Sequence, residues 1–196
     1  MRYSSSHKEE TRQRLVESSG AIAKRGGFAT TGVDGLMKAI GLTGGAFYSH
    51  FPSKNDLFTE VVRRELSQSP ILAQDGCLTA DRLERCLDSY LSLAHLHNPE
   101  AGCAIPALGA EIARAAPQVR EEAEHWLCAL QGAWAQALGD NDLAWALIAQ
   151  CVGALVVARM LVSEDTQRNV LAASRAMLHS ALAPGEQPSR NSRAER

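Results

Sequence analysis

The segment from Thr43 to Lys54 constrains this chain more than any other, because it places signals that start and end helices at very short range. A short amphipathic helix is predicted just upstream, since apolar side chains recur at i, i+3, i+4 and i+7 in Val33, Leu36, Met37 and Ile40. Gly41 ends that helix, and a second short helix is predicted over 44–50, before Pro52. Two short helices joined by a glycine turn indicate a helix-turn-helix, the motif that places its second helix in the major groove of DNA.

Polar residues at the expected helix starts support this interpretation. Thr31 with Asp34, and Ser53 with Asp56, have the spacing of capping boxes. Thr43 is a good N-cap for the short helix, where its hydroxyl and the free N–H groups behind it suit a phosphate. These three capping signals predict the beginnings of three separate helices, two of which flank the glycine turn.

The predicted second helix has small residues in its first turn and polar residues on its outer flank. Its small residues, which let the backbone approach the groove floor, are Gly44, Gly45 and Ala46. Tyr48 and His50 are expected on the outer flank as hydrogen-bond donors. Lys54 falls in the first turn of the next helix, where a cation opposes the helix dipole, and a phosphate partner would explain a lysine there.

Three spaced runs, residues 27–34, 39–48 and 51–58, resemble the N-terminal domain of TetR-type (TetR/AcrR) transcriptional regulators. The resemblance implies an all-α homodimeric repressor with a three-helix DNA-binding head and a helical body that senses a ligand and dimerises. It implies phosphate contacts from Thr31, Thr43, Tyr48 and Lys54, and base-facing positions at Gly44, Gly45 and Ala46. Family members often carry Lys or Arg at the position of Gly44 and Tyr at that of His50, so base readout is expected to use thymine methyl groups and DNA shape.

The net charge of −2 is unevenly distributed. Residues 1–66 hold ten Lys or Arg against seven Asp or Glu, a net of +3, and the remainder carries −5. A basic head on an acidic body is the distribution that attraction to phosphates requires.

The division expected from the sequence is a DNA-binding domain over 8–68, a sensing and dimerisation domain over 69–183, and a disordered tail over 184–196 that is poor in apolar residues. Neither an internal repeat nor a strand signal is found. The predicted helices cover 8–24, 33–40, 44–50, 54–68, 79–96, 103–115, 118–138, 142–162 and 165–182.

The five cysteines are scattered and odd in number, which does not suit a secreted disulfide framework. The chain also begins without the apolar segment of a secretory signal, so a cytoplasmic protein is expected. Residues 143–162 approach the length of a membrane span, but their alanine-rich composition favours a helix buried in a bundle, and no membrane partner is expected.

Three body residues are candidates for sensing. Cys103 follows Gly102 near an expected helix N-terminus, with His95 and His97 close in sequence, which favours a thiolate that reacts with electrophiles. Some TetR-type regulators release DNA when a cysteine is modified, and residues 102–111 resemble the equivalent stretch in that branch. The alternative is a small buried residue that packs the helix. Trp126 and Trp134 are candidates to line a ligand cavity or, alternatively, to belong to the core.

Enzymatic and metal-binding interpretations find little support. His125 and Cys128 share a helix face but make only half a metal site, and common catalytic motifs are missing, so no catalytic residue, metal or cofactor is expected. The predicted partners are double-stranded DNA with an inverted repeat, a second copy of the chain, and an unknown small-molecule or electrophile inducer. The alternative is a helical ligand-binding or adaptor protein whose helix-turn-helix is only structural.

Overall fold

The computed structural model describes residues 5–68 and 78–183, and within these ranges the chain forms helices and no strands. The all-α prediction is therefore confirmed. The helices are α1 (Ser5–Gly26), α2 (Val33–Ala39), the 3-10 helix η1 (Gly44–Ser49), α3 (Lys54–Ser67), α4 (Ala80–Tyr90), α5 (Leu93–His97), α6 (Ile105–Ile112), α7 (Pro117–Leu138), α8 (Asn141–Arg159) and α9 (Glu164–Leu182). The tail predicted over 184–196 lies outside the described residues.

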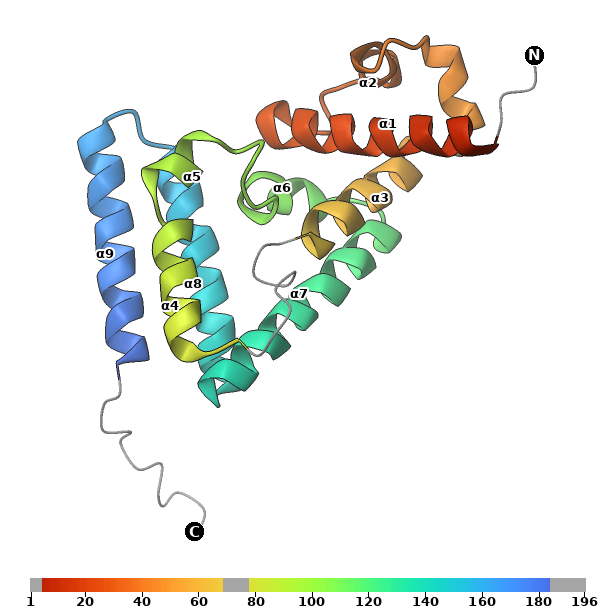
Figure 1. Ribbon diagram of the computed structural model, residues 1–196. Coiled ribbons are helices and arrows are strands. Elements are labelled where there is room, and N and C mark those ends of the chain that lie inside the picture. The colour runs from red at the N-terminus through yellow and green to blue at the C-terminus, as the bar shows by residue number, and fades with distance from the viewer. Residues whose placement is uncertain (1–4, 69–77, 184–196) are drawn as a thin grey trace.

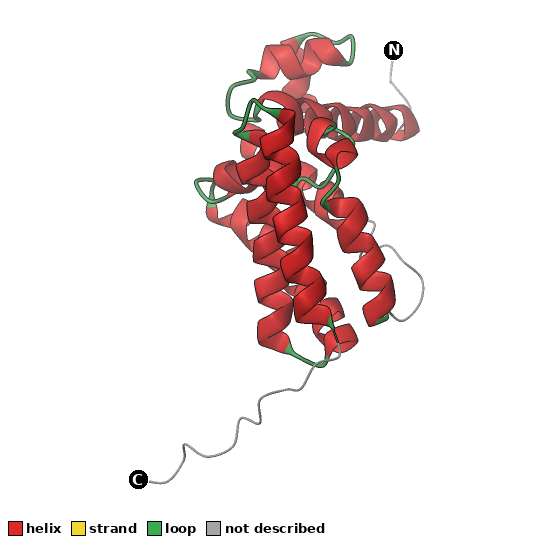
Figure 2. Cartoon of the chain, turned by 90° about the vertical axis from the view of Figure 1, so that its left-hand side faces the viewer, coloured by secondary structure: helices red, strands yellow, loops and turns green. Residues whose placement is uncertain are grey.

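The helices form a head and a body at two ends of the molecule (Figures 1 and 2). The head consists of α1, α2, η1 and α3. In the body α4, α8 and α9 lie side by side, α7 runs from the body up to α3, and α6 lies between the two parts (Figure 1). The contacts of α3 with α7 and of α1 with α6 fix the head on the body.

Two hydrophobic cores hold these parts together. The body core gathers leucines and alanines of α4, α7, α8 and α9. The core of the head contains Leu15, Leu36, Phe47 and Leu57 from its own helices, all fully buried. It is completed by four residues that follow the expected division at residue 68, namely Ala104, Leu108, Val119 and Ala123. The core of the head therefore extends into α6 and α7.

Three predicted helices differ in the structure. The helix expected over 79–96 is interrupted after Tyr90, because the side chain of Ser92 accepts a hydrogen bond from the backbone N–H of His95 (3.2 Å) and begins α5. The helix expected over 103–115 is the shorter α6, with Pro106 in its first turn. The helix expected over 44–50 has the tighter 3-10 winding of η1.

Helix α8 is long and apolar enough to span a membrane by length and composition alone, with a mean hydropathy of 1.6. It is the one described helix that passes this test, and helices in the cores of soluble proteins pass it too. One face of α8 packs into the body core through Leu147, Cys151 and Leu155. Its opposite face is exposed at Val156 and Val157, so the helix still has one apolar face to cover.

Candidate nucleic-acid interface and adjoining cavity

The turn between α2 and η1 has the geometry that the sequence predicts. Gly41 has a φ of 78°, a conformation that favours glycine. The N–H of Gly41 donates to the carbonyl of Lys38 (3.0 Å), and the N–H of Leu42 donates to that of Met37 (2.9 Å). This pair of bonds is a Schellman motif, which ends α2 and turns the chain into η1.

One side of η1 is anchored and the other is open. Phe47 is fully buried in the core of the head. Thr43 and Tyr48 are exposed, Tyr48 by 69%, and a Cβ added at Gly45 would meet nothing within 4 Å. The open side is the one that a groove would meet, so Thr43, Gly45 and Tyr48 remain candidates for DNA contact.

Gly44 and Ala46 face the head rather than open space. A Cβ added at Gly44 would lie 1.7 Å from a carboxylate oxygen of the exposed Asp34, so that side chain would have to turn aside. Ala46 is half-buried and packs against the core of the head. Glycine at 44 therefore leaves room for the Asp34 carboxylate beside the base-facing position that the resemblance implies.

The predicted caps have mixed outcomes. The Ser53–Asp56 cap is confirmed, since the hydroxyl of Ser53 accepts from the backbone N–H of Asp56 (3.2 Å). The Thr31–Asp34 capping box is wrong, because the N-cap position of α2 is taken by Gly32, and the hydroxyl of Thr31 donates to the carbonyl of Gly27 (3.4 Å). Thr43 occupies the N-cap position of η1, but its side chain makes no cap hydrogen bond.

Lys54 has partners within the head. Its ammonium donates to the carbonyl of Ala29 (3.1 Å) and lies 4.9 Å from the centre of the Phe28 ring. Desolvation lowers the pKa of Lys54, and the nearby carboxylate of Glu111 opposes that shift. These contacts explain a lysine at a helix N-terminus without a phosphate, so its DNA contact stays a prediction.

His50 does not lie on the open flank that the sequence suggests. It is half-buried, and its Nδ1 has no hydrogen-bond partner among the described residues. Desolvation, followed by the charges of Lys8 and Arg12, lowers the pKa of His50. The ring is therefore neutral near pH 7.

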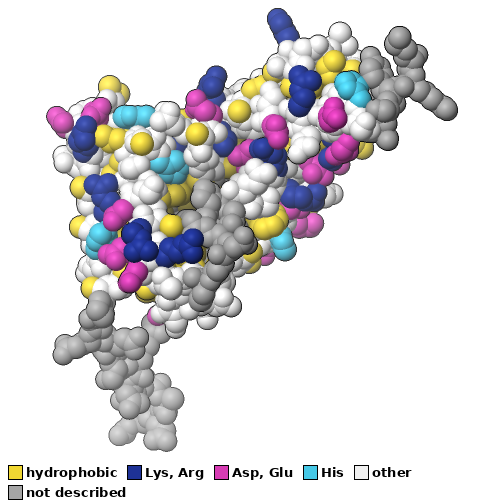
Figure 3. Space-filling view, viewed as in Figure 1, with side chains coloured by type: hydrophobic (Ala, Val, Ile, Leu, Met, Phe, Trp, Pro, Cys, Tyr) yellow, Lys and Arg dark blue, Asp and Glu magenta, His cyan; other side chains and the backbone are white. Residues whose placement is uncertain are grey.

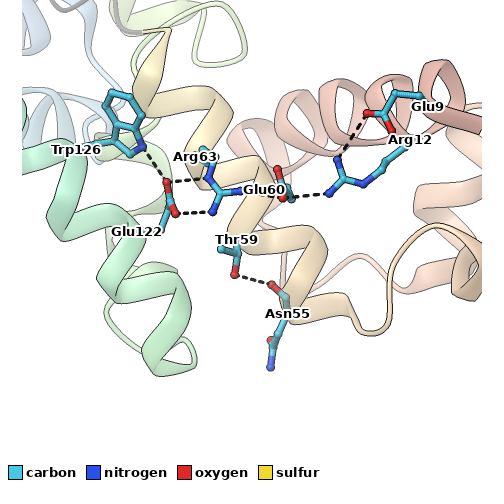
Figure 4. Close-up of polar contacts among 8 residues, drawn as sticks. All are labelled: Glu9, Arg12, Asn55, Thr59, Glu60, Arg63, Glu122 and Trp126. Atoms are coloured by element: carbon cyan, nitrogen blue, oxygen red, sulfur yellow. Dashed lines mark hydrogen bonds and ion pairs between the residues drawn. The ribbon is translucent and has the colours of Figure 1, made fainter. Parts of the chain in front are cut away.

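Two sets of polar contacts tie the head to the body. The carboxylate of Glu111 on α6 accepts from the backbone N–H groups of Phe28 (3.0 Å) and Ala29 (2.7 Å), in the turn between α1 and α2. The second set is a chain of side chains drawn in Figure 4, in which Arg12, Glu60, Arg63, Glu122 and Trp126 follow one another.

That chain crosses from α1 through α3 to α7. Arg12 meets Glu60 at 3.0 Å, and Glu60 meets Arg63 at 2.8 Å. Arg63 donates to both carboxylate oxygens of Glu122 (3.0 and 2.8 Å), and Glu122 also accepts from the indole N–H of Trp126 (2.9 Å). The hydrogen bond from Arg63 is the largest cause that lowers the pKa of Glu122, and this pair also raises the pKa of Arg63.

A cavity of about 880 Å³ lies where the head meets the body. We call it the head–body cavity. Its walls come from α1, α3, α4, α5, the start of α6 with the segment before it, and α7: Glu17, Ala21, Lys24, Arg64, Glu65, Leu66, Gln68, Cys86, Ser89, Tyr90, Ala94, His95, Asn98, Glu100, Ala101, Gly102, Cys103, Ile105, Trp126, Leu127 and Leu130. A volume of this size suits a drug-sized molecule.

The three residues that the sequence suggests for ligand or redox sensing do not lie at one site. Trp126 and Cys103 line the head–body cavity. Trp134 does not. It is buried in the body core, where its indole N–H has no partner among the described residues.

Cys103 lies two residues before α6, and its environment opposes a thiolate. Its backbone N–H donates to Nε2 of His95 (3.0 Å), and His97 instead pairs with Gln167. Burial raises the pKa of the Cys103 thiol, against the smaller opposing effects of hydrogen bonds from the Ile105 backbone and the Tyr90 side chain. The expected thiolate is therefore wrong in direction.

Sequence reasoning missed Lys24 and Glu111. Lys24 is only 9% exposed, and its ammonium pairs with Glu65 (2.7 Å) and donates to the carbonyl of Gly102 (3.2 Å). No local pattern marks either residue, because their partners lie tens of residues away in the chain. A lysine in a last helical turn and a glutamate in an alanine-rich helix are both ordinary.

On the face drawn in Figure 3, Lys and Arg side chains alternate with Asp and Glu side chains over both ends of the molecule. The excess of basic residues in the head is therefore not gathered into one patch on this face. DNA affinity is expected to depend on individual contacts of η1 and its neighbours as well as on net charge.

Comparison with known proteins gives matches over the head and over the fold. Residues 18–61 match the family model described as bacterial regulatory proteins, tetR family. The HTH-type transcriptional regulator AcrR of Shigella flexneri is 40% identical over 63 residues, which are 32% of this chain. The match spans only 28% of that relative's length.

Solved structures share the fold over almost the whole chain. The reduced form of E. coli NemR has a TM-score of 0.68 at 21% identity and covers 87% of this chain and 97% of its own. A TetR transcriptional regulator from Chloroflexus aurantiacus J-10-FL has a TM-score of 0.72 at 23% identity, with coverage of 91% and 97%. The sequence match and the shared fold together confirm the resemblance to TetR/AcrR-type regulators.

Proposed function

We propose that this TetR/AcrR-type chain is a homodimeric transcriptional regulator, most simply a repressor, that binds an inverted-repeat operator through two copies of its head. The observation that carries the proposal is the helix-turn-helix matched over residues 18–61, with Thr43, Gly45 and Tyr48 on the open side of η1. DNase footprinting on the region upstream of the protein's own gene tests it. A protected inverted repeat supports the proposal, and uniform weak protection that vanishes at 200 mM salt contradicts it.

The dimer interface is proposed on α8 and α9. Val156 and Val157 on α8, Met160 at its C-cap and Met177 on α9 are exposed apolar side chains. Paired with their symmetry mates, the two helices would form a four-helix interface, the isologous arrangement of a two-fold dimer. Gly153 is exposed, and a Cβ there would meet nothing within 4 Å, so a second copy has room to approach closely.

The signal that releases DNA is proposed to be a reversible ligand in the head–body cavity. The raised thiol pKa of Cys103 makes modification of this cysteine the second candidate. Release then requires the ligand to bind one arrangement of the heads more tightly than the other. The proposal contains no catalytic step and places the protein in the cytoplasm.

A helical ligand-binding or adaptor protein remains the alternative function. It would share the cavity and the fold, but its helix-turn-helix would have no DNA partner. Specific binding of a promoter fragment, with an affinity that Tyr48→Phe lowers, favours the regulator. Full retention of partner or ligand binding, with no sequence-specific DNA binding in any fragment of the upstream region, favours the adaptor.

A further inference from the structure

Each Lys, Arg or Glu side chain in the described walls of the head–body cavity has an oppositely charged neighbour. Each wall carboxylate has a cation within 4 Å: Glu17–Arg64 at 3.1 Å, Glu65–Lys24 at 2.7 Å, Glu65–Arg64 at 3.2 Å and Glu100–Arg25 at 3.5 Å. Lys24 and Glu65 are also nearly inaccessible to solvent, with side chains 7% and 10% exposed. An ion in the cavity would find no unpaired counter-charge in these walls. The guanidinium of Arg159 lies near His95 without a carboxylate partner among the described residues, but it donates to the carbonyls of Leu96 (3.3 Å) and His95 (3.4 Å) and is not part of the walls.

His95 adds no charge to the cavity. Its Nδ1 donates to the carbonyl of Tyr90 (2.7 Å), and its Nε2 accepts from the backbone N–H of Cys103 (3.0 Å). An acceptor nitrogen requires the neutral ring, and burial lowers the pKa of His95 in the same direction. Both ring nitrogens are therefore occupied, and the histidine is a fixed, neutral part of the wall.

The remaining lining is largely apolar and aromatic, with the neutral polar side chains of Gln68, Ser89 and Asn98 among it. The indole of Trp126 gives its N–H to Glu122, which leaves its ring as an apolar surface. The other apolar side chains of the wall are Ala21, Leu66, Ala94, Ile105, Leu127 and Leu130. Removing an ion from water into such a site without a counter-charge costs far more free energy than removing a neutral molecule of the same size.

Lys24 offers a donor to a polar group of the ligand. Lys24 has three N–H donors, and two of them have the partners Glu65 and Gly102 among the described residues. Lys24 lies in the cavity wall, and its third donor would meet an acceptor oxygen of the ligand. Because the same ammonium holds the carbonyl of Gly102, two residues ahead of α6's N-cap, a ligand here contacts the link between α1 and α6 directly.

We propose that the head–body cavity binds an uncharged, largely apolar molecule that carries a hydrogen-bond acceptor. This proposal names the class of ligand for the proposed function. Only the effect of the ligand on DNA binding rests on that function. Its binding is independent of any operator. A neutral ligand also needs no rearrangement of the ion pairs between α1 and α3, so these pairs stay intact when the cavity is filled.

Two fluorescent probes that share one scaffold test the proposal on the full-length protein without DNA. N-phenyl-1-naphthylamine is uncharged, and 8-anilinonaphthalene-1-sulfonate carries one negative charge. The neutral probe is expected to bind saturably and at least tenfold more tightly than the anion. Ethidium serves as a planar cation and is expected to bind at least tenfold more weakly than the neutral probe. Equal or tighter binding of either ion, or no saturable binding of the neutral probe, overturns the proposal.

Three variants locate the site. Ala94→Trp places an indole at an exposed position of the wall and is expected to weaken the neutral probe at least tenfold. Ala129→Trp, on an exposed position of α7 outside the cavity, is the matched control and is expected to bind like wild type. Glu65→Gln removes the carboxylate that Lys24 and Arg64 share, so the anionic probe is expected to gain at least fivefold.

The outcomes separate this inference from the proposed function. If Ala94→Trp binds the neutral probe like wild type, the probe lies elsewhere and the inference fails, whatever the footprint shows. If the probe results hold but no operator is protected, the cavity is a neutral-ligand site in a protein that does not regulate transcription. Melting temperatures by circular dichroism confirm that each variant is folded. If Glu65→Gln is unfolded, the two tryptophan variants still decide the case.

Discussion

The carboxylate of Glu111 lies 2.7 Å from the backbone nitrogen of Ala29, so a helix of the body holds the turn that leads into the helix-turn-helix. The same carboxylate accepts from Phe28, and Lys54 donates to the carbonyl of Ala29. The position of this turn therefore depends on α6. A ligand that moves the segment before α6 would act on the DNA-binding head through it.

Glu111→Gln tests this connection. Glutamine keeps the size of the side chain but offers one carbonyl oxygen to two N–H donors, and its amide places a further donor beside them. We expect the unfolding free energy to fall by about 1–2 kcal/mol, as for loss of a charge-assisted hydrogen bond at a partly exposed site. Operator affinity by fluorescence anisotropy should fall more steeply than stability predicts. Glu124→Gln, at an exposed position of α7, is the control. Equal loss in both variants would contradict the connection.

Gly44 and Gly45 are expected to respond differently to the same substitution. Gly44→Glu forces the Asp34 side chain to turn aside and places a second carboxylate beside it, so both the melting temperature and DNA binding should decrease. Gly45→Glu meets no neighbour, so the unfolding free energy should change by no more than about 0.5 kcal/mol, as for surface substitutions, while a carboxylate facing the groove abolishes binding. A Gly45→Glu protein that still binds its operator would show that this side of η1 does not face DNA.

Tyr48 and Lys54 are predicted to contact phosphates. Lys54→Ala should reduce the slope of log affinity against log salt by about one, and Tyr48→Phe should weaken all DNA sequences alike with little change in slope. Because Lys54 also holds the Ala29 carbonyl, Lys54→Ala should lower stability slightly as well. Titrations at four salt concentrations provide the slopes. An unchanged slope in Lys54→Ala would assign this lysine to the fold alone.

The dimer is best tested at Val157. This side chain is exposed on α8, so Val157→Arg should yield a folded monomer that no longer binds a full inverted repeat. Ala154→Arg serves as the contrast, because Ala154 is buried within its own chain and a buried arginine should destabilise the fold itself. Sedimentation at micromolar concentration and thermal melting distinguish the two effects. A Val157→Arg dimer as stable as wild type would place the interface elsewhere.

Acid should loosen the contact between head and body at Glu122. Its folded-state pKa lies below the ordinary value of 4.5, chiefly because Arg63 donates to it. The stabilisation is therefore complete above about pH 4.5 and is lost as the pH falls through the lower folded-state pKa. The pair is partly exposed, so the effect should be roughly 1 kcal/mol or less. Urea unfolding between pH 3 and 7 should show a shallower acid dependence in Glu122→Gln than in wild type.

Local signals account for what the sequence predicted correctly. The turn at Gly41 and the Ser53 cap depend on residues only a few positions apart, so their patterns are visible in the chain. The prediction that Thr31 caps α2 failed because the helix begins one residue later, with Gly32 at the N-cap position and no side-chain cap. In each of these cases the deciding contact lies within a single turn of the chain.

Long-range contacts account for what the sequence did not predict. The prediction of a lowered pKa for Cys103 failed because burial raises this pKa more than the nearby hydrogen bonds lower it, and burial depends on the packing of helices far apart in the chain. The ties of Lys24 to Gly102 and of Glu111 to Ala29 join residues 78 and 82 positions apart. No periodicity in either segment records such a pairing, and the same holds for the head–body cavity.

The head completes its hydrophobic core with Ala104 and Leu108 around α6 and with Val119 and Ala123 of α7. A fragment cut after residue 68 would expose the apolar side chains that these four residues cover, and it should aggregate or fold poorly. Grafting this head onto another body would therefore succeed only if the recipient supplies matching residues, or if α6 and the start of α7 travel with it. Recombination between relatives is expected to tolerate crossovers within α8 or α9 better than crossovers at the apparent end of the DNA-binding region.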